Sequence, residues 1–237
     1  MLYGQGMYAI SLTSIPPRFP RLGPVLHSLL AQDPAPAEII LCLPRAYRRF
    51  PGKVEAPALP DGVRLLWSDV DHGPATKILP AAHALSDTDS PLIYCDDDWL
   101  MPPGWAAALL RSRERGVAVA ASGFTVDRLG RRSHARTGEV DIAQGFSGVL
   151  VDPDWLAAPD LTPPETAWPV DDIWLSGHLA RRGIAIKLAD AARDGMRLAF
   201  DDAHELQHAV ISGRTRDQAN RACAELLHRE YGIWPPL

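Results

Sequence analysis

The sequence lacks the features of a membrane-spanning or secreted protein. None of its apolar runs approaches the roughly 20 residues that a bilayer-spanning helix needs. The opening stretch, MLYGQGMYAISLTS, has no basic segment followed by a long apolar core, so we expect no signal peptide. The only cysteines, Cys42, Cys95 and Cys223, are far apart and show no CxxC spacing, which predicts buried free thiols in a reducing compartment. We therefore expect a soluble, cytoplasmic protein without a transmembrane segment.

Several familiar site patterns are also missing. There is no GxSxG nucleophile motif and no GxxxxGK[ST] phosphate loop, and the segment after the first predicted strand lacks the glycine fingerprint of dinucleotide binding. The net charge is −5, and the basic residues form short clusters instead of a stripe. A nucleic-acid partner is therefore not expected.

What the sequence does contain is an alternation of strand-like and helix-like segments. Its 237 residues, 46% hydrophobic and 22% charged, are typical of a soluble domain with a real core. Up to Gly116 the pattern alternates, which is typical of a parallel, doubly wound sheet. The strands are predicted at residues 8–13, 38–43, 63–67 and 92–95, and the helices at 21–32, 75–85 and 102–115.

After Gly116 the alternation of predicted strands and helices becomes less regular. Strands are predicted at residues 117–126, 148–151 and 184–188, and helices at 169–182 and 215–231. We expect one α/β domain over residues 1–237, with a mixed, mostly parallel sheet flanked by helices. Its first part, about residues 1–100, would bind a nucleotide, and residues 101–237 would form an acceptor side that includes the C-terminal helix.

The most unusual stretch is PLIYCDDDWLMPPGW, residues 91–105, where an apolar strand runs directly into Asp96, Asp97 and Asp98. Adjacent carboxylates at a strand end repel one another unless cations or donors neutralise them. If strand alternation continues, Asp96 and Asp98 face one side and Asp97 the other. Such a pair of carboxylates suits a hard divalent cation. The alternative is an aspartate-rich turn that caps the next helix.

Two further segments contain possible anion-binding groups. In DHGPATKILPA, residues 71–81, Lys77 is predicted near a helix N-terminus, where a cation opposes the helix dipole. A bound phosphate would explain it, and a solvated surface lysine is the alternative. In SLTSIPPRF, residues 11–19, a proline-stiffened loop offers Thr13, Ser14 and Arg18 as donors to a base, ribose or diphosphate.

The acidic pair Asp171 and Asp172 begins the predicted helix at residues 169–182. These carboxylates either complement the helix dipole or supply a general base whose pKa is raised by its neighbour. His204 and His208 are four residues apart. On a helix they would share a face and supply imidazole to a metal, unless they are simply solvated or packed in the core.

Taken in order, ISLTSIPPRF, GPATKILPA, LIYCDDDWLMPPGW, FSGVLV and VDDIWLSGHLARRGI resemble the GT-A glycosyltransferases, especially the family 2-like branch and its bacterial relatives. The resemblance implies a GT-A-type, Rossmann-like fold and a metal-dependent transfer of sugar from a nucleotide-diphosphate donor, of UDP or GDP type, to a hydroxyl. The acceptor, a glycan or small molecule, is unknown. The alternatives are a nucleotidyltransferase of similar fold and a non-catalytic sugar- or nucleotide-binding module.

The resemblance also implies roles for individual residues. CDDDW is similar to the DxD motif that holds Mn²⁺ or Mg²⁺ on the donor diphosphate, with Asp98 as the direct ligand and Asp96 nearer the donor ribose or sugar. Thr13, Ser14, Arg18, Lys77 and Asp97 would belong to the nucleotide site, and Gly148 would allow close backbone approach to the sugars. Asp172 would be the base of an inverting reaction, with Asp171 as the alternate, and His204 or His208 a further metal ligand. The pair is Asp-Asp where the family commonly has Glu-Asp, which leaves the choice of base open.

Overall fold

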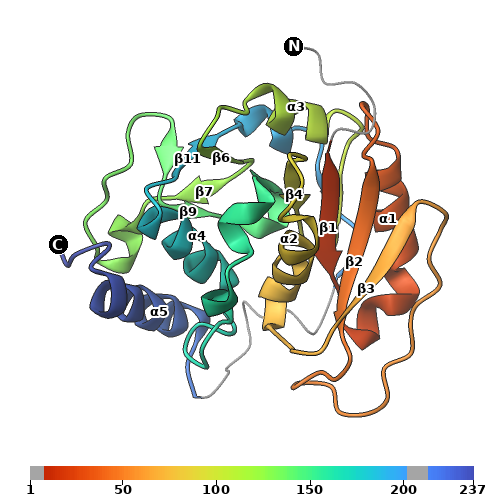
Figure 1. Ribbon diagram of the computed structural model, residues 1–237, viewed down its shortest axis with the longest axis horizontal. Coiled ribbons are helices and arrows are strands. Elements are labelled where there is room, and N and C mark those ends of the chain that lie inside the picture. The colour runs from red at the N-terminus through yellow and green to blue at the C-terminus, as the bar shows by residue number, and fades with distance from the viewer. Residues whose placement is uncertain (1–7, 202–212) are drawn as a thin grey trace.

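The computed structural model describes residues 8–201 and 213–237 (Figure 1). Its centre is an eight-stranded sheet with the strand order β3-β2-β1-β4-β10-β6-β11-β8. The strands of this sheet are β1 (Ala9–Thr13), β2 (Glu38–Pro44), β3 (Val63–Ser68), β4 (Leu92–Tyr94), β6 (Val117–Ala120), β8 (Glu139–Val140), β10 (Val149–Val151) and β11 (Ala185–Leu188).

The sheet is mixed but mostly parallel. The first four strands in chain order pair in parallel, β1 with both β2 and β4, and β2 with β3. Strand β10 runs antiparallel to β4 and to β6, while β11 is parallel to β6 and antiparallel to β8. The carboxyl ends of β1 to β4 therefore meet at one edge, where open α/β sheets bind ligands.

Helices cover both faces of this sheet, in two layers around a core of apolar strand residues. Helices α1 and α3 pack on one face, and α2 and α4 on the other. Helix α5 packs on the outer side of α4, through Cys223 and Leu227. The helices are α1 (Leu22–Leu30), α2 (Leu79–Leu85), α3 (Trp105–Arg111), α4 (Asp171–Arg181) and α5 (Arg216–Tyr231).

Short elements connect this framework. Two small two-stranded sheets are formed by β5 (Trp99–Leu100) with β12 (Arg197–Leu198), and by β7 (Gly123–Phe124) with β9 (Ile142–Ala143). The 3₁₀ helices are η1 (Pro16–Arg21), η2 (Gly73–Lys77), η3 (Val126–Leu129), η4 (Gly145–Ser147), η5 (Pro153–Leu156), η6 (Pro159–Leu161) and η7 (Asp190–Arg193). Among the described helices, none is long and apolar enough to cross a membrane.

Three sequence predictions need correction. The helix predicted at residues 75–85 is divided into η2 and α2, because Pro80 has no N–H to continue the hydrogen-bond ladder. The helix predicted at 102–115 is shorter, since α3 begins only after the Pro-Pro-Gly turn. The strand predicted at 117–126 is two strands, because β7 leaves the main sheet and pairs closely with β9.

Candidate active site

A cavity of about 600 Å³ opens at the carboxyl ends of β1 to β4. It brings together residues that are widely separated in the sequence, and most of the predicted site residues line it. Those that do are Thr13, Ser14, Arg18, Lys77, Asp96, Asp97, Asp98, Asp171 and Asp172. His204 and His208 lie outside the residues that the structure describes.

The end of β1 and the loop after it are held in place by side-chain hydrogen bonds within the site. The Thr13 hydroxyl donates a 2.7 Å hydrogen bond to the Cys42 carbonyl, at the end of the neighbouring strand β2. The Ser14 hydroxyl donates to Asp97 Oδ2 at 2.5 Å, and the Tyr47 hydroxyl donates to the Ser14 carbonyl at 2.8 Å. Both predicted hydroxyl donors thus hold the protein's own groups.

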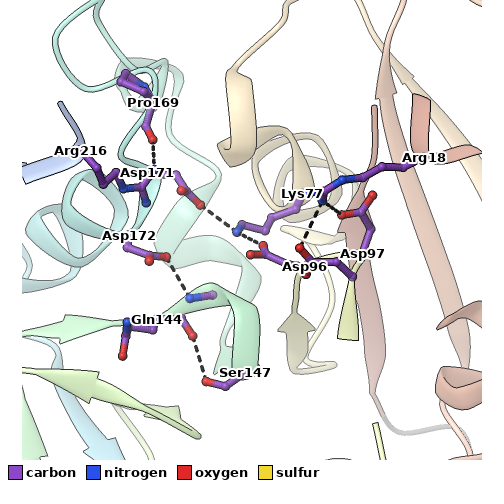
Figure 2. Close-up of polar contacts among 12 residues, drawn as sticks. Arg18, Lys77, Asp96, Asp97, Gln144, Ser147, Pro169, Asp171, Asp172 and Arg216 are labelled. Carbon is purple, nitrogen blue, oxygen red and sulfur yellow. Dashed lines mark hydrogen bonds and ion pairs between the residues drawn. The ribbon is translucent and has the colours of Figure 1, made fainter. Parts of the chain in front are cut away.

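The aspartate triplet, Asp96–Asp98, follows β4 as a turn. Asp97 is buried and forms an ion pair with Arg18, whose guanidinium lies 3.4 Å from Asp98 Oδ2. Asp96 points the other way and is ion-paired with Lys77 (Figure 2). The predicted alternation within the triplet is therefore wrong, because β4 ends at Tyr94 and Arg18 contacts both Asp97 and Asp98, although Asp96 and Asp98 both line the cavity.

Burial works against charge on Asp97 and Asp98. Burial raises the pKa of Asp97, while Arg18 and the Ser14 hydroxyl oppose the rise. Burial, together with the charges of Asp96 and Asp97, raises the pKa of Asp98 to about 7. Further positive charge beside Asp98 would therefore favour its ionised form at neutral pH.

Asp98 offers a suitable oxygen for a divalent cation. Its Oδ1 atom is buried and has no hydrogen-bond partner among the described residues. An uncompensated carboxylate oxygen beside two other carboxylates fits a hard cation. In residues 8–201 and 213–237, however, no three His, Cys, Asp or Glu side chains are already grouped as a metal site. The chemistry of the donors fits, and the cation-binding arrangement is not preformed within these ranges.

Lys77 connects the triplet to the second acidic group. Its side chain is 2% exposed, and its Nζ atom is ion-paired with Asp96 and lies 2.9 Å from Asp171 Oδ2. Burial alone would lower the pKa of Lys77, but Asp171, Asp96 and Asp172 outweigh it and raise that pKa well above its usual value. The alternative of a solvated surface lysine is therefore wrong. Lys77 is the last residue of η2 and directly precedes Ile78, the N-cap residue of α2.

The helix-start pair, Asp171 and Asp172, occupies the first two positions of α4 without capping it. The N-cap residue is Val170, and no side-chain capping bond forms there. Asp171 is 2% exposed, whereas Asp172 is partly exposed and accepts a 2.9 Å hydrogen bond from the Gly145 N–H (Figure 2). Burial, followed by the charge of Asp171, raises the pKa of Asp172 to about 7, with Lys77 and Arg216 opposing the rise.

The glycines around η4 differ from expectation. Gly148 has a φ of 104°, and a Cβ there would lie 2.4 Å from the Trp105 indole, so its lack of a side chain serves core packing. Gly148 is not among the residues that line the cavity. A Cβ on Gly145 would lie 2.7 Å from Lys77 Nζ and 3.2 Å from Asp172 Oδ1. Gly145 is therefore the glycine whose lack of a side chain leaves room for Lys77 and Asp172.

Sequence reasoning missed Arg216, which lines the cavity together with Trp168. Arg216 begins α5 and donates a hydrogen bond to the Pro169 carbonyl, just before the helix-start pair (Figure 2). Trp168 Nε1 donates to the Asp71 carbonyl at 3.0 Å, which connects the segment before α4 to the loop after β3. A basic residue in the first turn of a helix is electrostatically unfavourable, so this signal was available for Arg216.

Comparison with solved structures identifies the fold. A mannosyltransferase from Pyrobaculum calidifontis, solved with GDP-Man and Mn²⁺, matches with a TM-score of 0.50 at 16% identity, over 79% of this chain and 55% of that one. The chain thus spans about half the length of that enzyme. The galactosyltransferase LgtC, solved with donor and acceptor sugar analogs, matches with a TM-score of 0.47 at 12% identity, over 97% of each chain.

No protein-family model matches this chain, and neither does the sequence of any curated protein. The predicted GT-A-type fold, with a mostly parallel central sheet flanked by helices, is nevertheless confirmed by the structural match to the mannosyltransferase.

Proposed function

We propose that this protein is a glycosyltransferase that moves a sugar from a nucleoside-diphosphate donor to an acceptor hydroxyl, with inversion at the sugar. The observation that carries the proposal is the meeting of two acidic groups in one cavity. The triplet and the helix-start pair line the same space, with Lys77 between them. Transfer from such a donor needs charge compensation at the diphosphate and a base at the acceptor, and the two groups are suited to these separate tasks.

The donor diphosphate would lie beside the triplet. Asp98 and Asp96 are the carboxylates that would hold Mn²⁺ or Mg²⁺, which when bound supplies positive charge to the departing diphosphate. Arg18, which is ion-paired with Asp97, keeps that buried carboxylate in place behind them. The role of Asp97 is then to fix Arg18 and the triplet turn, since its two oxygens are occupied by Arg18 and Ser14.

The nucleoside would occupy the part of the cavity beyond the ends of β1 and β2. Tyr47 and Phe50 line this part and form an edge-to-face pair with ring centroids 6.2 Å apart. Aromatic side chains of this kind offer flat apolar surface to a base or a ribose. The donor class we propose is a UDP- or GDP-type sugar.

Asp172 is the better candidate for the base. Asp171 is 2% exposed and lies within ion-pair distance of Lys77, whereas Asp172 is partly exposed to the cavity and is oriented by the Gly145 N–H. A pKa of about 7 gives Asp172 useful basicity at neutral pH while leaving a large fraction ionised. In the reaction the oxygen of the acceptor hydroxyl would form a bond to the sugar carbon as the bond from that carbon to the diphosphate breaks. Asp172 would accept the proton of the hydroxyl.

The acceptor would bind beside the aromatic side chains that line the cavity. Trp99 and Phe146 line the cavity and lie with ring centroids 5.3 Å apart, and Trp168 lines it as well. Aromatic faces of this kind stack on the apolar side of sugar rings. A glycan or another hydroxyl-bearing small molecule is therefore the acceptor class we propose.

A turnover assay tests the proposal. The protein would be incubated with a panel of UDP- and GDP-sugars and Mn²⁺, with released nucleoside diphosphate measured with and without a panel of sugar acceptors. We expect acceptor-stimulated release from one donor class, lost with EDTA and in Asp98→Ala. Absence of release from every sugar donor by the folded protein, with or without acceptors, would contradict the proposal.

A further inference from the structure

We propose that Lys77 is an internal counter-ion of the aspartate triplet, which keeps the affinity of the free protein for divalent cations low until a nucleoside diphosphate binds. The nucleotide part of this inference rests on the proposed function. The counter-ion part rests on the contacts of Lys77 alone.

The first step in the argument is the position of the ammonium group. Lys77 Nζ is ion-paired with Asp96 and lies 2.9 Å from Asp171, in a side chain that is 2% exposed. It therefore occupies space between the two acidic groups from which bulk water is excluded. A second cation at Asp96 would be repelled by this ammonium at short range, where solvent screening is weak.

The second step is that the remaining carboxylates of the triplet are also partly engaged. Asp97 is held by Ser14 and Arg18, and Arg18 is 3.4 Å from Asp98 Oδ2. Within the triplet, Asp98 Oδ1 is a buried oxygen that has no hydrogen-bond partner among the described residues. This oxygen is open to a cation, while the two basic side chains reduce the attraction for one.

The third step concerns what a nucleoside diphosphate would change. Its negative charge attracts both Lys77 and a divalent cation, so it compensates the repulsion between them. Ion and nucleotide would then bind cooperatively, each raising the affinity for the other by the same factor. Lys77 thereby acts as a positioning residue, since it sets when the cation is held and does not need to touch the reacting atoms.

The close packing around Lys77 supports a fixed position of its ammonium group between the two acidic groups. A Cβ on Gly145 would lie 2.7 Å from Nζ, and Gly145 N–H holds Asp172. The Gly145 backbone therefore lies close to the ammonium, whose ion-pair partners are Asp96 and Asp171. An arrangement as tight as this favours one position of the charge in the free protein.

The test measures Mn²⁺ binding to the nucleotide-free protein by the loss of the free-ion signal in electron paramagnetic resonance. We expect weak binding to the wild type and binding about tenfold tighter or more to Lys77→Met, because an ammonium beside the site is removed. Lys53→Met removes an exposed lysine that does not line the cavity, and should match the wild type. Lys77→Arg retains the charge and should also bind Mn²⁺ weakly.

Lys77→Met leaves Asp96 and the buried Asp171 without their ammonium partner and can impair folding. The double variant Lys77→Met/Asp171→Asn removes one charge of each sign, so its net charge equals that of the wild type. It too should bind Mn²⁺ about tenfold more tightly than the wild type. Wild-type affinity for Mn²⁺ in this double variant, folded by circular dichroism, would overturn the counter-ion role, as would tight Mn²⁺ binding by the nucleotide-free wild type.

Adding UDP or GDP separates this inference from the proposed function. A nucleotide that tightens Mn²⁺ binding by a larger factor in the wild type than in the double variant supports the cooperative part, and an equal factor in both contradicts it. If the variants bind Mn²⁺ more tightly but no nucleotide binds, the counter-ion role stands and the glycosyltransferase proposal fails. If a nucleotide binds with Mn²⁺ and the variants show no gain, the proposal for Lys77 fails alone.

Discussion

The aspartate triplet and the helix-start pair show two ways to place carboxylates in one cavity. The triplet follows a buried strand, and the basic side chains of Arg18 and Lys77 balance its charge. The pair begins a helix, where Lys77 balances Asp171 and a backbone N–H orients Asp172. The difference suggests a division of labour, because cation-balanced oxygens suit ligand binding and a single oriented carboxylate with a raised pKa suits proton transfer.

Among the tests of this division between the two acidic groups, we expect the largest effect on kcat from substitutions in the helix-start pair. Asp172→Asn should lower kcat by about 1,000-fold, since an amide cannot accept the proton, while donor affinity stays near the wild-type value. Asp171→Asn should reduce kcat less, because Asp171 acts through Lys77. Steady-state kinetics and calorimetry measure both, with Asp154→Asn, outside the cavity, as the control. Equal losses in the two variants would remove the distinction between them.

The next effect concerns stability and the triplet. Asp97→Asn breaks a buried ion pair and should lower the free energy of unfolding by about 3 kcal/mol. Urea denaturation measures it. Asp69→Asn breaks an exposed pair with Arg45 and should change stability little. A stability of Asp97→Asn equal to that of Asp69→Asn would mean that Asp97 does not anchor Arg18.

A smaller effect is the pH dependence of turnover. Asp172 is useful as a base only when ionised, and its pKa is raised to about 7 by burial and Asp171, against the opposing charges of Lys77 and Arg216. The value of kcat should therefore fall as the pH drops below 7, approaching about tenfold per pH unit, and should level off above it. A pH series of kcat from 5.5 to 8.5 tests this. A flat series, with chemistry shown to be rate-limiting, would contradict the role of Asp172.

The sequence predicted well the elements whose signals are local. Strands β1 to β4 are mostly apolar, and all four appear within one residue of the predicted bounds. Helix α5 begins one residue after the start predicted at 215, and in the structure a capping box of Thr215 and Gln218 precedes it. Such patterns depend on neighbours in the chain, so a single sequence contains them.

The contacts inside the site could not be predicted in the same way. The burial of Lys77 depends on Asp96 and Asp171, which come from different elements. The close approach of Gly145 to Lys77 also depends on how η4 packs against the opposite side of the cavity. What the sequence offered was an indirect signal: a lysine predicted where a helix would disfavour it, which pointed to an unusual environment but not to its partners.

The most direct test of the central claim is a calorimetric titration of the protein with UDP, GDP, CDP and dTDP, each in Mn²⁺ and in EDTA. The account predicts that UDP or GDP binds in Mn²⁺, that EDTA weakens this binding at least tenfold, and that Asp98→Ala abolishes the metal dependence. Failure of all four nucleotides to bind the folded protein in Mn²⁺ would contradict the claim that the triplet receives a donor diphosphate.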